Sequence, residues 1–166
     1  MPKLRPMQAP DIPAVLTIQE ESYPDELLET AEVLSARLAS HPDYAWVAEE
    51  AQEACAYLFT YPVRLGSIAP FNSEFARHED ADCLYLHDLA VGLLTSGRGV
   101  GPALVRHALD HAKARGLQHA ALVAVQGSQD FWSRMGFKAC PVQDVGRADI
   151  LATYGGGAVY MTRSLA

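Results

Sequence analysis

The order of apolar and polar residues along the chain predicts a mixed α/β fold. Apolar or β-branched runs predict strands over residues 3–7, 45–49, 54–61, 84–91, 120–125, 137–142 and 158–163. Apolar residues at helical spacing predict helices over residues 11–23, 30–38, 100–115 and 129–135. Segment 62–82 has neither pattern, and segment 144–154 is ambiguous. This order favours a mixed central sheet of six to seven strands flanked by about four helices.

A glycine-rich turn separates the predicted strand 84–91 from the helix that begins near Val100. Gly97, Gly99 and Gly101 remove side chains where this helix starts. The N–H groups of a first helical turn have no partner inside the helix, and they carry about half a positive charge. Phosphates and pyrophosphates commonly bind at such a place. A turn whose glycines serve only close packing is the alternative interpretation.

Two other glycine-rich phosphate motifs do not fit this turn. A P-loop requires Lys and then Ser or Thr after its last glycine, but Pro102 and Ala103 follow Gly101. A dinucleotide fingerprint would place a glycine at Pro102 and an acidic residue about twenty positions later, where residues 119–123 offer none.

Three segments carry a resemblance to a known family. Ser96-Gly97-Arg98-Gly99-Val100-Gly101, after Leu89-Ala90-Val91, resembles the acyl-CoA motif of the GNAT N-acetyltransferases, with Ser96 where Gln or Arg is usual. Residues 131–137 are similar to the family segment Phe-Tyr-x-x-x-Gly-Phe, with Trp132 at the position of a Tyr that commonly acts as general acid. Residues 86–91 resemble the arylalkylamine N-acetyltransferase branch, which has histidines at the positions of His87 and Tyr85.

The resemblance implies a single GNAT domain over residues 1–166 and acetyl-CoA as co-substrate. It implies that the pyrophosphate is held by Ser96, Gly97, Arg98, Gly99, Val100 and Gly101. It also implies that Leu89, Ala90 and Val91 pair with the pantetheine amides, and that Phe131 and Trp132 flank the thioester.

Acetyl transfer to a primary amine requires a base. An alkylamine with a pKa of about 10.4 is almost wholly protonated at neutral pH, and freeing its lone pair costs about 4.6 kcal/mol. Alternation places Tyr85 and His87 on one face of the strand and Asp88 on the other. Because imidazole titrates near neutral pH, His87 is the best candidate for the general base. It would accept the proton through one or two waters that Tyr85 orients. A core histidine bonded to a backbone carbonyl is the alternative.

A general acid is less necessary than a base. The indole N–H of Trp132 is not acidic. Expelling an unprotonated thiolate costs at most about 2 kcal/mol, so we expect activity to survive the tryptophan. Tyr154 and Tyr160 are phenols that could replace the acid, although the sequence does not place them.

The amine pocket is expected near the end of the first helix. Tyr23 and Asp88 are the substrate-binding candidates, and segments 23–29 and 62–82 would shape the pocket. The acidic residues of this region form either an exposed helix end or an acidic mouth that attracts an amine: Glu20, Glu21, Asp25, Glu26 and Glu29. Loop 62–82 is either a binding loop or a surface excursion.

Composition limits the classes of partner and ligand that the protein is expected to bind. A net charge of −7 over 166 residues argues against nonspecific nucleic-acid binding. No run is long enough to span a membrane, and the N-terminus has no apolar signal core, so a cytoplasmic protein is expected. The three cysteines form no CxxC motif, and His107 and His111 lack the Glu of a zinc-protease helix, so we expect no metal. The sequence leaves a homodimer open.

The sequence as a whole predicts an acetyl-CoA-dependent N-acetyltransferase that acts on a primary amine of a small molecule, arylalkylamine-like or polyamine-like. One alternative is a catalytically weak acyl-CoA-binding sensor or interaction module. A protein lysine or N-terminal acetyltransferase is another.

Overall fold

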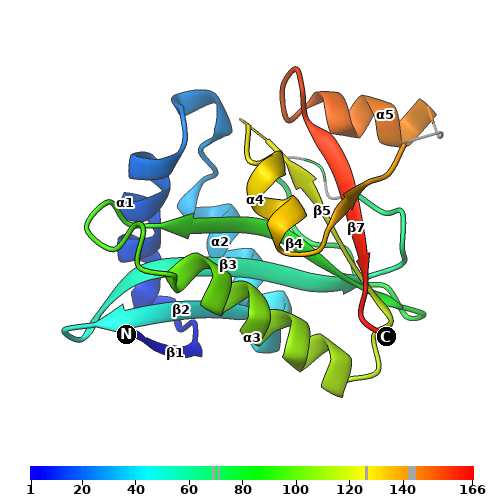
Figure 1. Cartoon of the computed structure of the whole chain (residues 1–166). Helices are drawn as coiled ribbons and strands as arrows, with labels where there is room; N and C mark the ends of the chain where they lie inside the picture. Colours follow the sequence, from blue (N-terminus) through cyan, green and yellow to red (C-terminus); the bar gives the residue numbers. More distant parts are fainter. Residues whose placement is uncertain (69, 71, 126, 142–144) are drawn as a thin grey trace. The chain divides into compact units, whose positions relative to one another are not determined.

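The computed structural model describes residues 1–68, 70, 72–125, 127–141 and 145–166 (Figure 1). In this part of the chain, seven strands are β1 Lys3–Pro6, β2 Ala45–Glu50, β3 Glu53–Val63, β4 Cys83–Val91, β5 His119–Ala124, β6 Lys138–Ala139 and β7 Val159–Ser164. Five α-helices are α1 Ile12–Ser22, α2 Ala31–Ser40, α3 Val100–Ala114, α4 Gln129–Arg134 and α5 Val145–Ala152.

The sheet is mixed, as the sequence predicts. Its strand order is β1-β2-β3-β4-β5-β7-β6. β4 and β5 are parallel, whereas β1–β2, β2–β3, β5–β7 and β6–β7 are antiparallel. The predicted class, a mixed α/β sheet of six to seven strands with helices, is therefore confirmed, with one helix more than expected.

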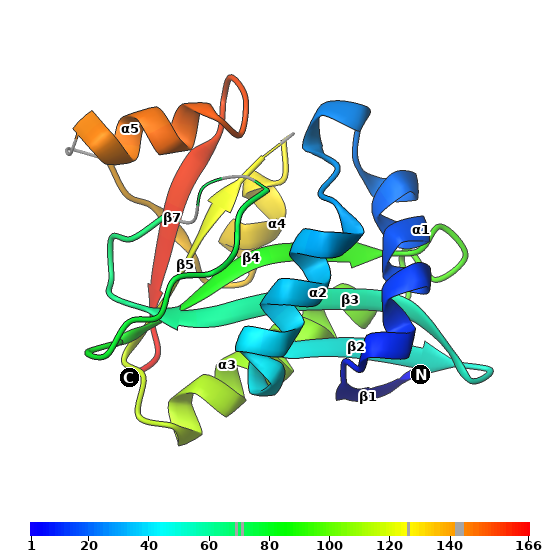
Figure 2. The ribbon, with the colours of Figure 1, turned by 180° about the vertical axis from the view of Figure 1, so that it is seen from behind.

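The chain forms two compact units, and the first comprises residues 1–61, 72–75 and 88–108. Its strands β1, β2 and β3 form an antiparallel meander, and the β2–β3 turn places Ala51 and Gln52 at φ of 53° and 65°. Helices α1 and α2 cover one face of these strands, and α3 starts on the opposite face (Figures 1 and 2). The first unit contains the glycine-rich turn, Tyr23 and Asp88.

The second unit comprises residues 62–71, 76–87 and 109–166. Here the first half of β4 pairs in parallel with β5, from Cys83 opposite His119 to Leu86 opposite Leu122. β7 pairs along the full length of β5. Strand β4 passes from the second unit to the first between His87 and Asp88. The second unit contains Tyr85, His87 and α4.

Three predicted boundaries differ from the structure. The strand expected over 137–142 shrinks to Lys138–Ala139, whose side chains are exposed, and Val142 lies outside the described residues. The ambiguous segment 144–154 contains α5, which the polar residues and the glycine of this segment had obscured; Asp144 is not described. β3 continues through Pro62 to Val63, whose carbonyl accepts the N–H of Asp82 at 3.0 Å.

Helix α4 begins and ends close to the predicted residues. Ser128 occupies its N-cap position, but the Ser128 side chain makes no capping hydrogen bond, contrary to expectation. Trp132 is buried on this helix.

Among the described residues, no helix combines the length and apolar character required to cross a membrane.

Candidate functional site

The glycine-rich turn is exposed and lies at the start of α3. Residues 96–99 are exposed, and Val100, the first residue of the helix, is buried. Gly97 and Gly99 adopt φ of 81° and 79°, which side chains rarely adopt. A Cβ on Gly97 would meet no atom within 4 Å, and one on Gly99 would meet only Met1 Cε, at 4.0 Å. No hydrogen bond found among the described residues uses the N–H of Gly97 or Gly99. This turn therefore fits a diphosphate.

Backbone hydrogen bonds hold the beginning of the turn against β3. Gly92 donates its N–H to the carbonyl of Cys55 at 2.8 Å, and a Cβ on Gly92 would lie 3.0 Å from that oxygen. The N–H groups of Thr95 and Ser96 both donate to the carbonyl of Gly92 at 3.0 Å. The turn thus starts from a fixed point on the sheet.

Arg98, the predicted cationic residue of the turn, forms an ion pair. Its Nη1 and Nη2 atoms donate to the two carboxylate oxygens of Glu50 at 3.0 and 3.2 Å. The side chains are 45% and 46% exposed. Hydrogen bonding from Arg98 lowers the pKa of Glu50 from its ordinary value. Arg98 can therefore contact a diphosphate either by exchanging Glu50 for phosphate or through the N–H donors that Glu50 leaves unused.

The end of β4 presents a backbone edge next to this turn in the chain. The N–H of Gly92 points toward β3, and peptide directions alternate along a strand, so Leu89 and Val91 direct their polar groups to the other edge. The pairing with β5 extends to Leu86. The carbonyl of Leu89 accepts the hydroxyl proton of Tyr23 at 2.8 Å. Of the three predicted pantetheine-binding residues, Leu89 and Val91 thus present their polar groups on the edge that contacts Tyr23, whereas those of Ala90 point toward β3.

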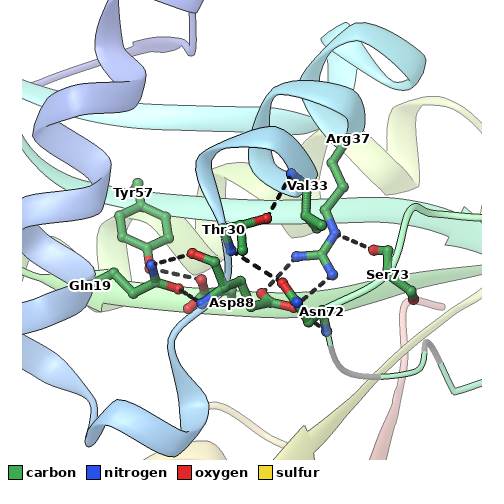
Figure 3. A network of polar contacts seen from close by, with 9 residues as sticks. Gln19, Thr30, Val33, Arg37, Tyr57, Asn72, Ser73 and Asp88 are labelled. Carbon is green, nitrogen blue, oxygen red and sulfur yellow. Dashed lines mark hydrogen bonds and ion pairs between the residues drawn. The ribbon is translucent and has the colours of Figure 1, made fainter.

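Asp88 is buried on the face opposite to His87, as alternation predicts. It is 6% exposed, and its Oδ2 accepts the hydroxyl proton of Tyr57 at 2.7 Å (Figure 3). Burial, and then the negative charge of Asp88, raise the pKa values of Tyr57 and Tyr23 well above the usual value of 10.0. Sequence reasoning missed Tyr57, because an aromatic residue in an apolar strand is indistinguishable from an ordinary core residue.

In the second unit, the predicted base and its partner lie beside a phenol. The ring of His87 is 6.2 Å from that of Tyr85 and 6.1 Å from that of Tyr154. His87 is half-buried, whereas Tyr85 and Tyr154 are 1% and 9% exposed. Of the two phenols considered as acids, Tyr154 is therefore the one adjacent to His87. The hydroxyl oxygen of Tyr160 instead accepts the N–H of Gly66 at 2.9 Å.

Trp132 packs as a core aromatic residue. It is 8% exposed and meets Phe131 and Phe137 edge to face, at centroid distances of 4.9 and 5.6 Å. Phe131 remains half-buried. Gly136 ends the turn after α4 with a φ of 90°. This packing explains the presence of a tryptophan at position 132 without a role in proton donation.

Glu29 belongs neither to an exposed helix end nor to an acidic mouth, so both alternatives are wrong for this one of the five acidic residues. Its carboxylate receives Nη1 and Nη2 of Arg37 at 2.6 and 2.7 Å, and the two side chains are 3% and 0% exposed (Figure 3). A buried charge requires a partner, and Arg37 supplies it from α2. Glu20, Glu21, Asp25 and Glu26 remain exposed.

Part of loop 62–82 is anchored to α2. Arg37 Nε donates to the carbonyl of Ser73 at 2.8 Å, and the N–H of Asn72 donates to Glu29 Oε2 at 2.7 Å. Phe75 stacks on Tyr61 at 3.9 Å and lies 4.5 Å from the guanidinium of Arg37. Residues 72–75 are therefore packed within the first unit and are not a surface excursion.

The first unit also contains a pocket of about 290 Å³ between α1, the β2–β3 turn and residues 92–95. Glu21, Glu50 and Glu53 contribute carboxylates to its lining. The exposed Leu93 and Leu94 lie on the same rim. Among the described residues, no three His, Cys, Asp or Glu side chains gather closely enough to hold a metal ion.

Known structures share this fold at low sequence identity. A GNAT-like decarboxylase, GphF, in complex with isobutyryl-CoA is 15% identical, with a TM-score of 0.78 over 99% of this chain and 100% of that one. The ribosomal-protein-S18-alanine N-acetyltransferase from Escherichia coli is 16% identical, with a TM-score of 0.72 over 100% and 95%. The PaiA N-acetyltransferase from Thermoplasma acidophilum in complex with coenzyme A is 14% identical, with a TM-score of 0.70 over 99% of each chain.

The sequence itself identifies the family. No curated protein is significantly similar to the chain by sequence. The model of the acetyltransferase (GNAT) family, however, matches residues 12–137, which is most of the chain and includes the glycine-rich turn, β4 and α4. The chain therefore belongs to the GNAT family of acetyltransferases.

Proposed function

We propose that this protein transfers an acetyl group from acetyl-CoA to a primary amine of a small molecule. The observation that carries the proposal is the exposed turn at the start of α3, where Gly97 and Gly99 leave room for a ligand in a chain of the GNAT family. Helix N-termini bind diphosphates through their N–H groups and dipole. CoA-bound structures with the same fold support acyl-CoA as the ligand.

The acyl-CoA would lie along residues of the first unit. The backbone of residues 96–101 would hold the diphosphate. Arg98 would also bind it, either once the guanidinium has exchanged Glu50 for phosphate or through its unused N–H donors. The edge of β4 at Leu89, Ala90 and Val91 would pair with the amides of the pantetheine arm. The bound thioester supplies an activated acetyl group, and Phe131 and Trp132 are the residues proposed to flank it.

His87 is the proposed general base. It would accept the ammonium proton of the amine through one or two waters, and Tyr85 would orient these waters. The neutral amine would then form the new N–C bond while the C–S bond breaks, and the nitrogen would release its second proton to solvent. The thiolate would take a proton from solvent or from Tyr154, which solvent would then reprotonate. The position of Tyr154, 6.1 Å from the ring of His87, makes it our choice between the two phenols.

The amine class follows from the resemblance and from charge. His87 matches the histidine of the arylalkylamine branch, and this match motivates an arylalkylamine-like or polyamine-like substrate. Tyr23 and Asp88 are the amine-binding candidates of the sequence, but their polar groups are bonded to the Leu89 carbonyl and to Tyr57. Glu21 adds an exposed carboxylate at the end of α1. Three free cysteines fit a reducing compartment, so the cytoplasm remains the expected location.

A CoA sensor without turnover is the second candidate. Trp132 stands at a family position where Tyr is common, and it is packed into the core. Thiol release from acetyl-CoA distinguishes the two candidates when it is measured over a panel of arylalkylamines, polyamines and lysine-containing peptides. Release with small amines supports the proposal. Release only with peptides favours a protein acetyltransferase, and CoA binding without release on any acceptor favours the sensor.

The pH dependence of turnover tests the base. We expect His87→Ala to lower kcat at neutral pH by about 10²- to 10⁴-fold, the usual contribution of a general base. The optimum should move to higher pH, because more amine is then already deprotonated. His107→Ala, on the exposed face of α3, is the matched control. A pH–rate profile of the His87 variant identical to that of the wild type would remove His87 from the mechanism.

A further inference from the structure

We propose that Tyr23 and Tyr57 are positioning residues that fix the chain on either side of the Asp88–Leu89 peptide, so that the N–H of Leu89 faces the reacting acyl group. Tyr57 belongs to no motif, and Tyr23 was expected to contact the amine. This inference rests on the proposed function, because it assigns these residues a role in the same acyl transfer.

The two phenols bind groups on either side of the Asp88–Leu89 peptide. The hydroxyl of Tyr57, on β3, donates to Oδ2 of Asp88 at 2.7 Å. The hydroxyl of Tyr23, at the end of α1, donates to the carbonyl of Leu89 at 2.8 Å. Both distances are typical of strong O–H···O hydrogen bonds. The side chain of one residue and the carbonyl of the next are thus each fixed to a separate element of the first unit.

The direction of the strand shows what these bonds orient. The N–H of Gly92 donates to Cys55 on β3, so the polar groups of Leu89, three residues earlier, point to the opposite edge of β4. The N–H and carbonyl of one residue share an edge of a strand. The N–H and carbonyl of Leu89 belong to two successive peptides that meet at its Cα. Tyr23 fixes the second of these peptides and Tyr57 holds Asp88 on the other side, so the Leu89 N–H between them has little freedom to turn.

Tyr23 is itself held in place by Gln19. The N–H of Tyr23 donates to the backbone carbonyl of Gln19 at 3.0 Å. The side-chain amide of Gln19 donates to the carbonyl of Glu29 at 3.0 Å and accepts the N–H of Glu29 at 2.8 Å (Figure 3). Gln19 thus fixes both ends of the segment 23–29. A phenol on such a restrained segment loses little further freedom when it binds Leu89.

Both phenols remain donors throughout the range in which an amine acetyltransferase works. Burial and the charge of Asp88 raise the pKa of each hydroxyl above its usual value, so neither loses its proton near neutral pH. Neither phenol needs to transfer its proton. The N–H of Leu89 would stabilise the negative charge that develops on the thioester oxygen, while the ammonium proton passes to His87 and the electron pair of the C–S bond leaves with sulfur.

Tyr23→Phe and Tyr57→Phe test the proposal, since each removes one hydroxyl and leaves the ring. Loss of one hydrogen bond corresponds to an effect of about tenfold. We expect kcat to fall about tenfold in each variant, with the KM for acetyl-CoA within about twofold of the wild type. Tyr61→Phe is the matched control, because Tyr61 is also a buried tyrosine of β3 and packs on Phe75. It should keep the wild-type kcat.

A second measurement does not depend on turnover. In isotope-labelled, ligand-free protein, the nuclear magnetic resonance of the Leu89 amide should shift in Tyr23→Phe and in Tyr57→Phe, and should stay in place in Tyr61→Phe. An unchanged Leu89 amide in both variants would overturn the inference. A normal kcat with a raised KM for the amine in Tyr23→Phe would also overturn it, by returning Tyr23 to amine binding. If the wild type transfers no acetyl group, the proposed function fails, and the Leu89 amide alone decides whether the phenols position this peptide.

Discussion

Two arginine–glutamate pairs in the first unit have the same chemistry and opposite environments. Arg37 and Glu29 form two bonds of 2.6 and 2.7 Å with side chains 0% and 3% exposed. Arg98 and Glu50 form two bonds of 3.0 and 3.2 Å with side chains 45% and 46% exposed. Water can replace either partner in the exposed pair, whereas neither partner of the buried pair can lose the other without a large desolvation cost. Burial therefore makes one pair part of the architecture and leaves the other exchangeable for a ligand.

The largest expected effect is on the buried pair. Arg37→Met leaves the carboxylate of Glu29 buried without its cation, and it also removes the donor to Ser73. Breaking such a pair costs about 3–5 kcal/mol of stability. Chemical denaturation should show a loss of this size, whereas Arg98→Met should change stability by less than about 1 kcal/mol. Equal losses in the two variants would contradict the distinction between the pairs.

A double variant separates charge from packing at the buried pair. In Glu29→Gln with Arg37→Met, no charge remains to be buried, so we expect part of the lost stability to return. If the double variant is less stable than Arg37→Met alone, the bond from the N–H of Asn72 to the Glu29 carboxylate outweighs the cost of the buried charge, and the pair is mainly a packing element.

The next effect concerns the turn that contains Arg98. Gly99→Val introduces a β-branched side chain at φ of 79°, which costs about 1–2 kcal/mol and distorts the turn. We expect the affinity for CoA, measured by calorimetry, to fall at least about a hundredfold. Gly116→Val is the matched control, because Gly116 has a φ of 85° and open space around its Cα but lies at the other end of α3. It should lose similar stability and bind CoA normally.

The turn was accessible to sequence reasoning because its signal is local. Three glycines, the apolar run before them and the helical spacing after them fall within one stretch of chain, and the structure places the strand, the turn and the helix where these patterns indicate. The same holds for α1 and α2, whose limits follow from Asp11, Thr30 and Tyr23-Pro24. Periodicity and turn residues are properties of neighbours in sequence, so they predict elements well.

The contacts that decide the role of each side chain are not local. Tyr23 and Leu89 are 66 positions apart, and Arg98 and Glu50 are 48 apart. Glu29 has the same chemistry as Glu21 and Glu26, yet it alone of the five acidic residues is buried, because Arg37 lies on the next helix. No pattern of spacing distinguishes these glutamates before the helices are packed. The predicted set of site residues therefore omitted Tyr57, and the sequence grouped Glu29 with acidic residues of a surface that it does not reach.

The smallest expected effect concerns the exposed pair of Arg98 and Glu50. Glu50→Gln removes the charge that competes with phosphate for Arg98, so we expect CoA to bind about two- to threefold more tightly at low ionic strength. The gain should shrink as salt is added, because exposed charges are screened within about 10 Å at 0.1 M salt. Glu53→Gln, a carboxylate of the same β2–β3 turn, should change CoA affinity less, since it forms no bond with Arg98 in the described structure. If Glu50→Gln weakens CoA binding instead, Glu50 orients Arg98 for the phosphate, and the exposed pair would then act as a preformed part of the site, as the buried pair does for the fold.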